Sequence, residues 1–196
     1  DKLTDTMTHD GLIDAFKKYH MGITAENIAE KLNISRKEQD NFALKSQNKT
    51  QLALKQNKFK DELISVNLDG SFLNSDEHPR KNLRAEDLEK LKSAFKENGT
   101  VTAGNASGIN DGAAAVLLTT LNEAEKKSLK PLVKIVSWSS VGVEPSLMGL
   151  GPIDAVKLAL KKANWKIEDI DLFEINEAFA AQSIAVIKGL NIDENK

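Results

Sequence analysis

The feature that most constrains this 196-residue chain is a polar turn, Asn-Glu-Ala-Phe-Ala at residues 176–180, set between two apolar runs. Residues 171–175 have the length and apolar character of a buried strand. Residues 181–188 have the apolar spacing of a helix, which Gly189 closes. A strand that turns directly into a helix presents polar side chains at the carboxyl edge of a sheet, where ligands of α/β folds bind. The turn therefore predicts a ligand site at Asn176.

The second half of the chain alternates between the patterns of strands and helices. Residues 133–139 have a strand pattern, and Pro152, a residue favoured at the first position of a helix, opens a helix pattern. Residues 171–175 and 181–188 repeat this order. The alternation predicts an α/β fold with a largely buried sheet. The small apolar run at 113–120 fits either the start of a helix or a fully buried strand.

The first half lacks long buried strands. Ser35 and Glu38 form a capping box, which predicts a surface helix that ends at about Asn57. Thr24 is a candidate cap for a shorter helix before it. We interpret this half as an excursion from the core rather than a self-sufficient domain.

Polar loops and short elements fill the rest of that half. Residues 62–68 alternate between apolar and polar, which predicts a half-buried strand, and Asp69-Gly70 predicts a turn after it. Residues 74–84 predict an exposed, basic loop. Apolar residues then predict a helix that ends near Gly99; they are Leu88, Leu91 and Phe95.

Composition excludes several functional classes. The formal net charge is −2, which offers no general attraction for nucleic acid. No window approaches the ~18 consecutive apolar residues that a membrane span needs. The chain has no cysteine, which excludes disulfides and thiolate metal sites within it. Because neither end has the character of a natural terminus, we expect a piece of a longer protein.

The turn at 176–180 closely resembles the Asn-Glu-Ala-Phe motif of the thiolases, which condense or cleave acyl groups on coenzyme A. Further resemblances lie at residues 20–27, at 100–108, in the loop around Arg80 and at 137–152. The implied fold is the layered αβαβα thiolase fold. It divides the chain into a coenzyme A-binding excursion, the end of the first core domain and half of the second, with the bounds 1–109, 110–131 and 132–196.

The resemblance implies a short-chain acyl pocket. His20-Met21-Gly22 is similar to a segment of acetoacetyl-CoA thiolases in which the histidine and methionine line the pocket, whereas longer-chain 3-ketoacyl-CoA thiolases generally lack that histidine. Met148 and Phe179 are implied as further pocket residues. Taken alone, His20 is more often a partly buried histidine beside a helix cap.

The resemblance also implies residues that bind coenzyme A. Ser107 corresponds to a serine that contacts the pantetheine arm, and Arg80 to an arginine that lies against the nucleotide, where a guanidinium suits both phosphate charge and stacking on adenine. The complete implied set is Met21, Arg80, Phe95, Ala103, Ser107 and Gly108. Without the family, the segment at 104–108 is a loop and Arg80 is a solvated surface residue.

Asn176 is the strongest catalytic candidate. In thiolases the matching asparagine fixes a water that, with a histidine from a later Gly-His-Pro segment, forms an oxyanion hole. Family chemistry also needs a nucleophilic cysteine and a second cysteine as base, and this sequence contains neither cysteine nor that histidine. We therefore expect the 196 residues to be inactive alone and the parent protein to be an acyltransferase that forms or cleaves acetoacetyl-CoA.

Two other functions remain open from the sequence: a non-catalytic module that binds coenzyme A or acyl-CoA, and a longer-chain 3-ketoacyl-CoA thiolase. The expected partner is an acyl-CoA substrate, with no covalently bound cofactor, no metal, no nucleic acid and no membrane. The resemblance implies a homodimer or homotetramer in the cytoplasm, with the mitochondrion as the alternative compartment.

Overall fold

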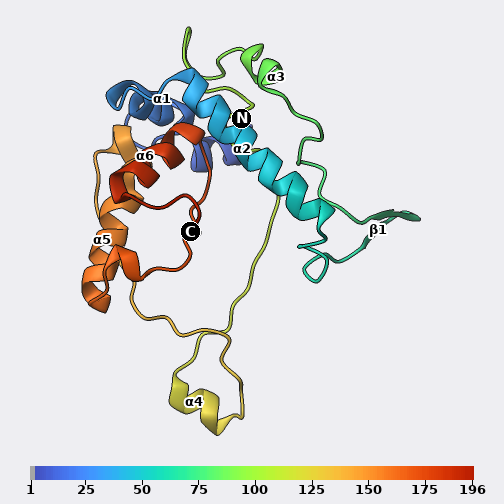
Figure 1. Cartoon of the computed structure of the whole chain (residues 1–196), viewed down its shortest axis with the longest axis vertical. Helices are drawn as coiled ribbons and strands as arrows, with labels where there is room; N and C mark the ends of the chain where they lie inside the picture. The colour runs from blue at the N-terminus through green and yellow to red at the C-terminus, as the bar shows by residue number, and fades with distance from the viewer. Residues whose placement is uncertain (1–2) are drawn as a thin grey trace.

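The computed structural model describes residues 3–196, so the first two residues of the predicted 1–109 excursion lie outside the described range. The helices α1 (Met21–Lys31), α2 (Arg36–Lys55), α5 (Gly151–Ala163) and α6 (Ala180–Leu190) gather in one body, and two thin extensions leave it (Figure 1). One extension ends in a hairpin of β1 (Val66–Leu68) and β2 (Ser71–Leu73), and the other carries α4 (Leu121–Lys126).

Short elements complete the described chain. A π-helical turn, Met7–Leu12, precedes α1, and α3 (Ala85–Glu89) lies beside α2. The 3₁₀ turn Pro145–Leu150 packs on α1, and a second 3₁₀ turn, Ile167–Asp169, follows α5.

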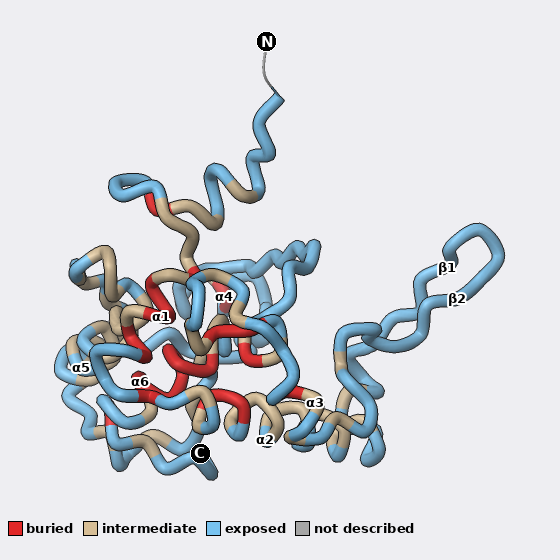
Figure 2. Tube along the Cα trace, turned by 90° about the horizontal axis from the view of Figure 1, so that it is seen from above, coloured by how far each residue is buried: buried red, intermediate tan, exposed pale blue. Residues whose placement is uncertain are grey.

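The core lies where α6 packs against α1 and α2 (Figure 2). On α6, Ala181, Ile184 and Ala185 share one face, as spacings of three and four residues require, and all three are buried. They meet Ile28 and Ala29 of α1. The alanines let the two helices approach closely, so the loops before each helix are brought near one another.

Of the two helix caps predicted from the sequence, one is confirmed and one is wrong. The predicted capping box is present, because Ser35 Oγ accepts from the N–H of Glu38 and the Glu38 carboxylate accepts from the N–H of Ser35. Thr24, however, is not a cap. The helix begins earlier, with His20 as its cap, and the buried Thr24 hydroxyl instead donates to the carbonyl of Met21 (2.6 Å).

The first-half strand and helix predictions were partly wrong. The turn at Asp69-Gly70 is confirmed by the positive φ of both residues, 48° and 92°. The predicted half-buried strand is reduced to β1, which is exposed because it pairs only with β2 in the projecting hairpin. The helix predicted to end near Gly99 ends at Glu89, and the chain then forms turns.

The strands predicted at 133–139 and 171–175 do not form a hydrogen-bonded sheet, and residues 113–120, predicted as a helix start or a buried strand, form neither. Within residues 3–196 the only sheet is the β1–β2 pair. A strand needs a neighbouring strand for its N–H and C=O groups, and these segments have no such neighbour among the described residues. Apolar side chains along them are consequently exposed, as at Leu117 (81%), Val133 (81%) and Leu172 (80%).

Candidate functional site

Three of the predicted site residues form an aromatic cluster. His20 stacks on Phe95 with ring centroids 4.6 Å apart, and Phe179 meets Phe95 edge to face with centroids 6.0 Å apart. His20 caps α1, Phe179 caps α6, and Phe95 lies on the turn between them in sequence. The structure thus joins residues from the predicted acyl pocket and the predicted coenzyme A-binding set.

Glycine at position 22 makes this cluster possible. A methyl group on Gly22 would lie 2.2 Å from Cγ of Phe95, well inside van der Waals contact. The N–H of Gly22 also donates to Nδ1 of His20 (3.0 Å), which orients the imidazole as the helix cap. The backbone of the first turn of α1 therefore forms part of the surface on which Phe95 rests.

Glu26 holds the turn that carries Phe95, a role that the sequence did not reveal. Its carboxylate is buried and accepts hydrogen bonds from the N–H groups of Thr100 (2.9 Å) and Val101 (2.8 Å) and from the Thr100 hydroxyl (3.0 Å). The N–H of Ala94 donates to the carbonyl of Val101, closing the turn. Glutamate on a helix is normally solvated, so no sequence signal distinguished it.

The loop Gly104–Gly108 pairs with the segment that precedes α6. Ser107 donates its N–H to the carbonyl of Ala178 (2.9 Å), and Ala180 donates its N–H to the carbonyl of Asn105 (2.9 Å). Ala106 and Phe179 face each other in the same short antiparallel contact. The predicted pantetheine loop and the predicted catalytic turn are therefore adjacent, although about 70 residues separate them in sequence.

A hollow of about 290 Å³ lies between this loop and α2. Ser107 and Gly108 line it on one side, and the α2 face that includes Phe42 and Ser46 lines it on the other. His78 closes a further side and lies so near Gly108 that a methyl group there would be 2.6 Å from its ring.

Glu177 lines the hollow, whereas Arg80 lies beside it and contacts a lining residue. Arg80 is exposed, and its N–H donates to Oε1 of Gln47 (2.9 Å), a residue of α2 that lines the hollow. Glu177 precedes α6, which begins at Ala180. Its carboxylate accepts from the Ser46 hydroxyl (2.7 Å) and lines the hollow.

The other predicted residues lie around this centre without lining the hollow. Asn176 is exposed, two residues before the carbonyl that Ser107 contacts. Met21 is the first residue of α1, and Ala103 is exposed beside the loop. Met148 is about half exposed (48%) on the Pro145–Leu150 turn.

The described residues provide neither a metal-binding cluster nor a membrane-spanning helix. Among residues 3–196, no cluster of histidine, aspartate and glutamate has the grouping that a metal ion needs. No helix within the same residues is long and apolar enough to cross a membrane.

Comparison with known proteins places this geometry in a family. The family model described as "Thiolase, N-terminal domain" matches residues 1–122, and "Thiolase, C-terminal domain" matches residues 129–196. The chain is 52% identical over 196 residues to an acetyl-CoA acetyltransferase of Shinella zoogloeoides, covering 98% of this chain and 50% of that protein. It is also 52% identical over 200 residues to the cytosolic acetyl-CoA acetyltransferase of Mus musculus, covering 99% of this chain and 50% of that protein.

Solved structures agree. The acetyl-CoA acetyltransferase of Bacillus anthracis superposes with a TM-score of 0.91 at 44% identity, covering 100% of this chain and 50% of that one. Human mitochondrial 3-ketoacyl-CoA thiolase in complex with CoA superposes with a TM-score of 0.92 at 42% identity, covering 100% and 49%. These superpositions confirm the predicted α/β thiolase fold. The chain spans about half the length of the relatives it matches. The chain belongs to the thiolase family.

Proposed function

We propose that the protein containing these residues is an acetyl-CoA C-acetyltransferase, which condenses two acetyl-CoA molecules to acetoacetyl-CoA and coenzyme A or runs the reverse thiolysis. The observation that carries the proposal is the convergence of His20, Phe95 and Phe179 beside the Ser107 loop. Identities of 52% to acetyl-CoA acetyltransferases support the same reaction.

In this proposal the hollow receives the extended part of coenzyme A. Ser107 and Gly108 border it with a hydroxyl and an open backbone, which suit the amides of a pantetheine arm. Arg80, exposed at the neighbouring loop, takes the adenine or a phosphate of the nucleotide. Ala103 and Phe95 are the remaining residues that contact coenzyme A in this proposal.

The acyl end would lie against the aromatic cluster. The stacked rings of His20 and Phe95 occupy volume that a long acyl chain needs, which favours a two-carbon group. Met21 precedes Gly22 at the same helix start, and Phe179 supplies the opposite wall. Met148 is assigned to the acyl pocket from the family resemblance.

Asn176 would supply a positioned donor for the thioester oxygen through a bound water. Negative charge develops on that oxygen as the enolate forms, so a fixed donor stabilises the transition state more than the ground state. The thiolate that carries the acyl group comes from outside these 196 residues, because they contain no cysteine.

A longer-chain 3-ketoacyl-CoA thiolase is the second candidate. It is favoured by the superposition on the human mitochondrial 3-ketoacyl-CoA thiolase. The TM-score of that superposition, 0.92, is as high as the scores of 0.91 and 0.87 for two acetyl-CoA acetyltransferases. The two functions differ in chain length: the proposed enzyme prefers acetoacetyl-CoA over 3-ketohexanoyl-CoA, and the second candidate reverses that preference.

We also place the enzyme in the cytosol as a homodimer or homotetramer. Cytosolic acetyl-CoA acetyltransferases of mouse and rat are among its relatives, which supports the compartment. Fractionation of the source cells checks the compartment, and sedimentation of the purified protein checks the assembly.

The decisive experiment uses protein made from the complete coding sequence. It should cleave acetoacetyl-CoA, and Asn176→Ala should lower kcat by about 10²–10³, the usual cost of one oxyanion donor. Asn122→Ala in α4, an exposed asparagine far along the other extension, is the matched control and should retain full activity.

Other outcomes of this experiment are equally informative. A folded protein that binds coenzyme A without any turnover would select the non-catalytic binding module. The 196-residue polypeptide alone should cleave no acetoacetyl-CoA, since it has no thiol. Measurable thiolysis by it would contradict the proposal that the reactive cysteines lie outside these residues.

A further inference from the structure

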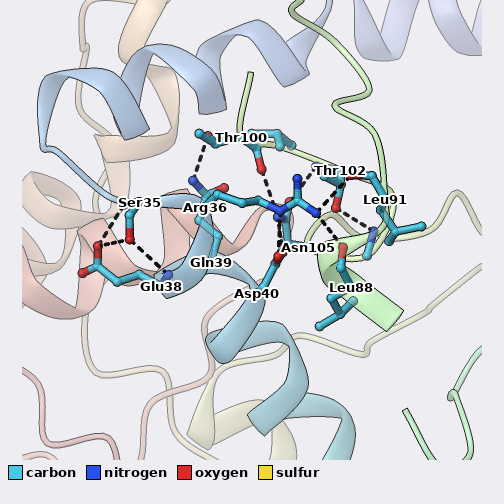
Figure 3. A network of polar contacts seen from close by, with 12 residues as sticks. Ser35, Arg36, Glu38, Gln39, Asp40, Leu88, Leu91, Thr100, Thr102 and Asn105 are labelled. Carbon is cyan, nitrogen blue, oxygen red and sulfur yellow. Dashed lines mark hydrogen bonds and ion pairs between the residues drawn. The ribbon is translucent and has the colours of Figure 1, made fainter. Parts of the chain in front are cut away.

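Asn105 connects the loop Gly104–Gly108 to its surroundings through every polar group it has (Figure 3). Its side-chain amide nitrogen donates to Asp40 (2.9 Å) and to the carbonyl of Thr100 (3.1 Å), and its side-chain oxygen accepts from the N–H of Thr102 (2.8 Å). Its backbone carbonyl accepts from Ala180. Because Asn105 is only 3% exposed, water cannot replace these bonds at low cost.

Asp40 anchors this residue from α2. One carboxylate oxygen accepts from Asn105, and the other accepts from Nε of Arg36 (2.7 Å). The same guanidinium donates to the carbonyls of Leu88 (2.6 Å) and Leu91 (3.1 Å), so it cannot turn without breaking those bonds. Asp40 is 6% exposed, and its carboxylate is held in one orientation by the buried Asn105 and the partly buried Arg36.

Asp40 affects the side of the loop that faces the hollow through Asn105, which it binds. Asn105 lines the hollow, whereas Asp40 does not, so a ligand there would touch the loop and not the carboxylate. Two residues further along, Ser107 is held to Ala178, and this contact continues the same antiparallel pairing.

We propose that Asp40 is a positioning residue for coenzyme A: through Asn105 it sets the conformation of the Gly104–Gly108 loop and keeps that loop in register with the 176–180 turn. The inference rests on the proposed function and deepens it. In this inference the buried Asp40 carboxylate on α2 supports binding of the pantetheine arm. It does not affect binding of the nucleotide, because the backbone of Arg80 is held by Gln47 and not by this network.

The test measures the Kd of coenzyme A and of 3′,5′-ADP, which lacks the pantetheine arm, on protein made from the complete coding sequence. Asp40→Ala removes both acceptor oxygens, so the bond from Asn105 is lost. We expect the Kd of coenzyme A to rise about tenfold, the effect of one hydrogen bond to a charged group. The Kd of 3′,5′-ADP should not change.

The double variant Asp40→Ala with Asn105→Ala separates positioning through Asn105 from general destabilisation. If Asp40 acts through Asn105, the Kd of coenzyme A in the double variant should rise no further than in Asn105→Ala alone. If Asp40→Ala does not fold, Asp40→Glu, which keeps the charge and displaces the carboxylate by one methylene, should raise the Kd of coenzyme A and leave that of 3′,5′-ADP unchanged. Glu38→Gln is the matched control: it changes a carboxylate on the same helix that bonds Ser35 and Lys188 and does not touch the loop.

The outcomes distinguish the two proposals. If the unmodified protein binds no coenzyme A, the proposed function is wrong, and the positioning role of Asp40 is wrong as well. Normal binding by the unmodified protein together with an unchanged coenzyme A Kd in Asp40→Ala overturns the positioning role alone. Equal weakening of both ligands, or a folded double variant whose coenzyme A Kd rises by the product of the two single fold-changes, also overturns it.

Discussion

The imidazole of His20 and the ring of Phe95 lie nearly parallel, inclined by 22° with their centroids 4.6 Å apart. The contact joins the cap of α1 to a turn that Glu26 of the same helix holds in place. Helix α1 therefore supplies both the stacked His20 and the Glu26 carboxylate that fixes the position of Phe95. The proposed acyl pocket depends on this double attachment.

Phe95→Ala should widen the acyl pocket. The substitution removes the ring that stacks on His20 and meets Phe179, so we expect kcat/KM for 3-ketohexanoyl-CoA relative to acetoacetyl-CoA to rise about tenfold or more, the range for added methylenes in an apolar pocket. Steady-state kinetics on the two substrates checks this. Phe72→Ala removes an exposed ring from the hairpin and should leave the ratio unaltered.

Gly22→Ala should destabilise the protein, although alanine is the better helix former. The added methyl group would lie 2.2 Å from Cγ of Phe95, and overpacking of this kind costs about 1–3 kcal/mol, more than the helix gains. Urea denaturation measures the change. The same substitution at Gly151, also in the first turn of a helix, meets Val143 only at ordinary contact distance and should be neutral or stabilising; a loss as large as that at Gly22 would refute the steric explanation.

Glu38 should make stability fall with acid. Hydrogen bonds from the backbone N–H and hydroxyl of Ser35, and then from Lys188, lower the pKa of its carboxyl from 4.5 to about 2. The depressed pKa means that the stabilisation is complete above about pH 4.5 and is lost as the pH falls through about 2. The difference in unfolding free energy between the unmodified protein and Glu38→Gln should therefore shrink across that window in denaturation curves. A difference that is constant with pH would contradict the capping-box origin of the shift.

The 196-residue polypeptide should self-associate when produced alone. Extended segments with unpaired backbone groups carry exposed apolar side chains such as Leu117 and Val133, and such edges pair with other chains. Sedimentation at increasing concentration should show species larger than a monomer. Leu117→Lys together with Val133→Lys should reduce the association, whereas a sharp monomeric melt independent of concentration in the unmodified polypeptide would speak against it.

Features that depend on neighbours a few residues away were readable from the sequence. The capping box of Ser35 and Glu38 and the turn at Asp69-Gly70 are such features, because the bonds or backbone angles that form them lie within one short segment. Pro152 likewise marks the start of α5, where it is the second residue. The motif at 176–180 and the further segments that resemble thiolases predicted the family, because short runs of residue types and their order carry that resemblance.

Tertiary structure decided what depends on distant partners. Thr24 was the predicted cap, but the helix begins earlier, with His20 as its cap, and Phe95 packs against that helix start. Glu26 and Asp40 read as ordinary helix-surface carboxylates, and only folding brings Thr100 and Asn105 to them. Amphipathic spacing predicts which side of a segment is apolar, but strand pairing and buried hydrogen bonds require a second segment whose position the local pattern does not contain.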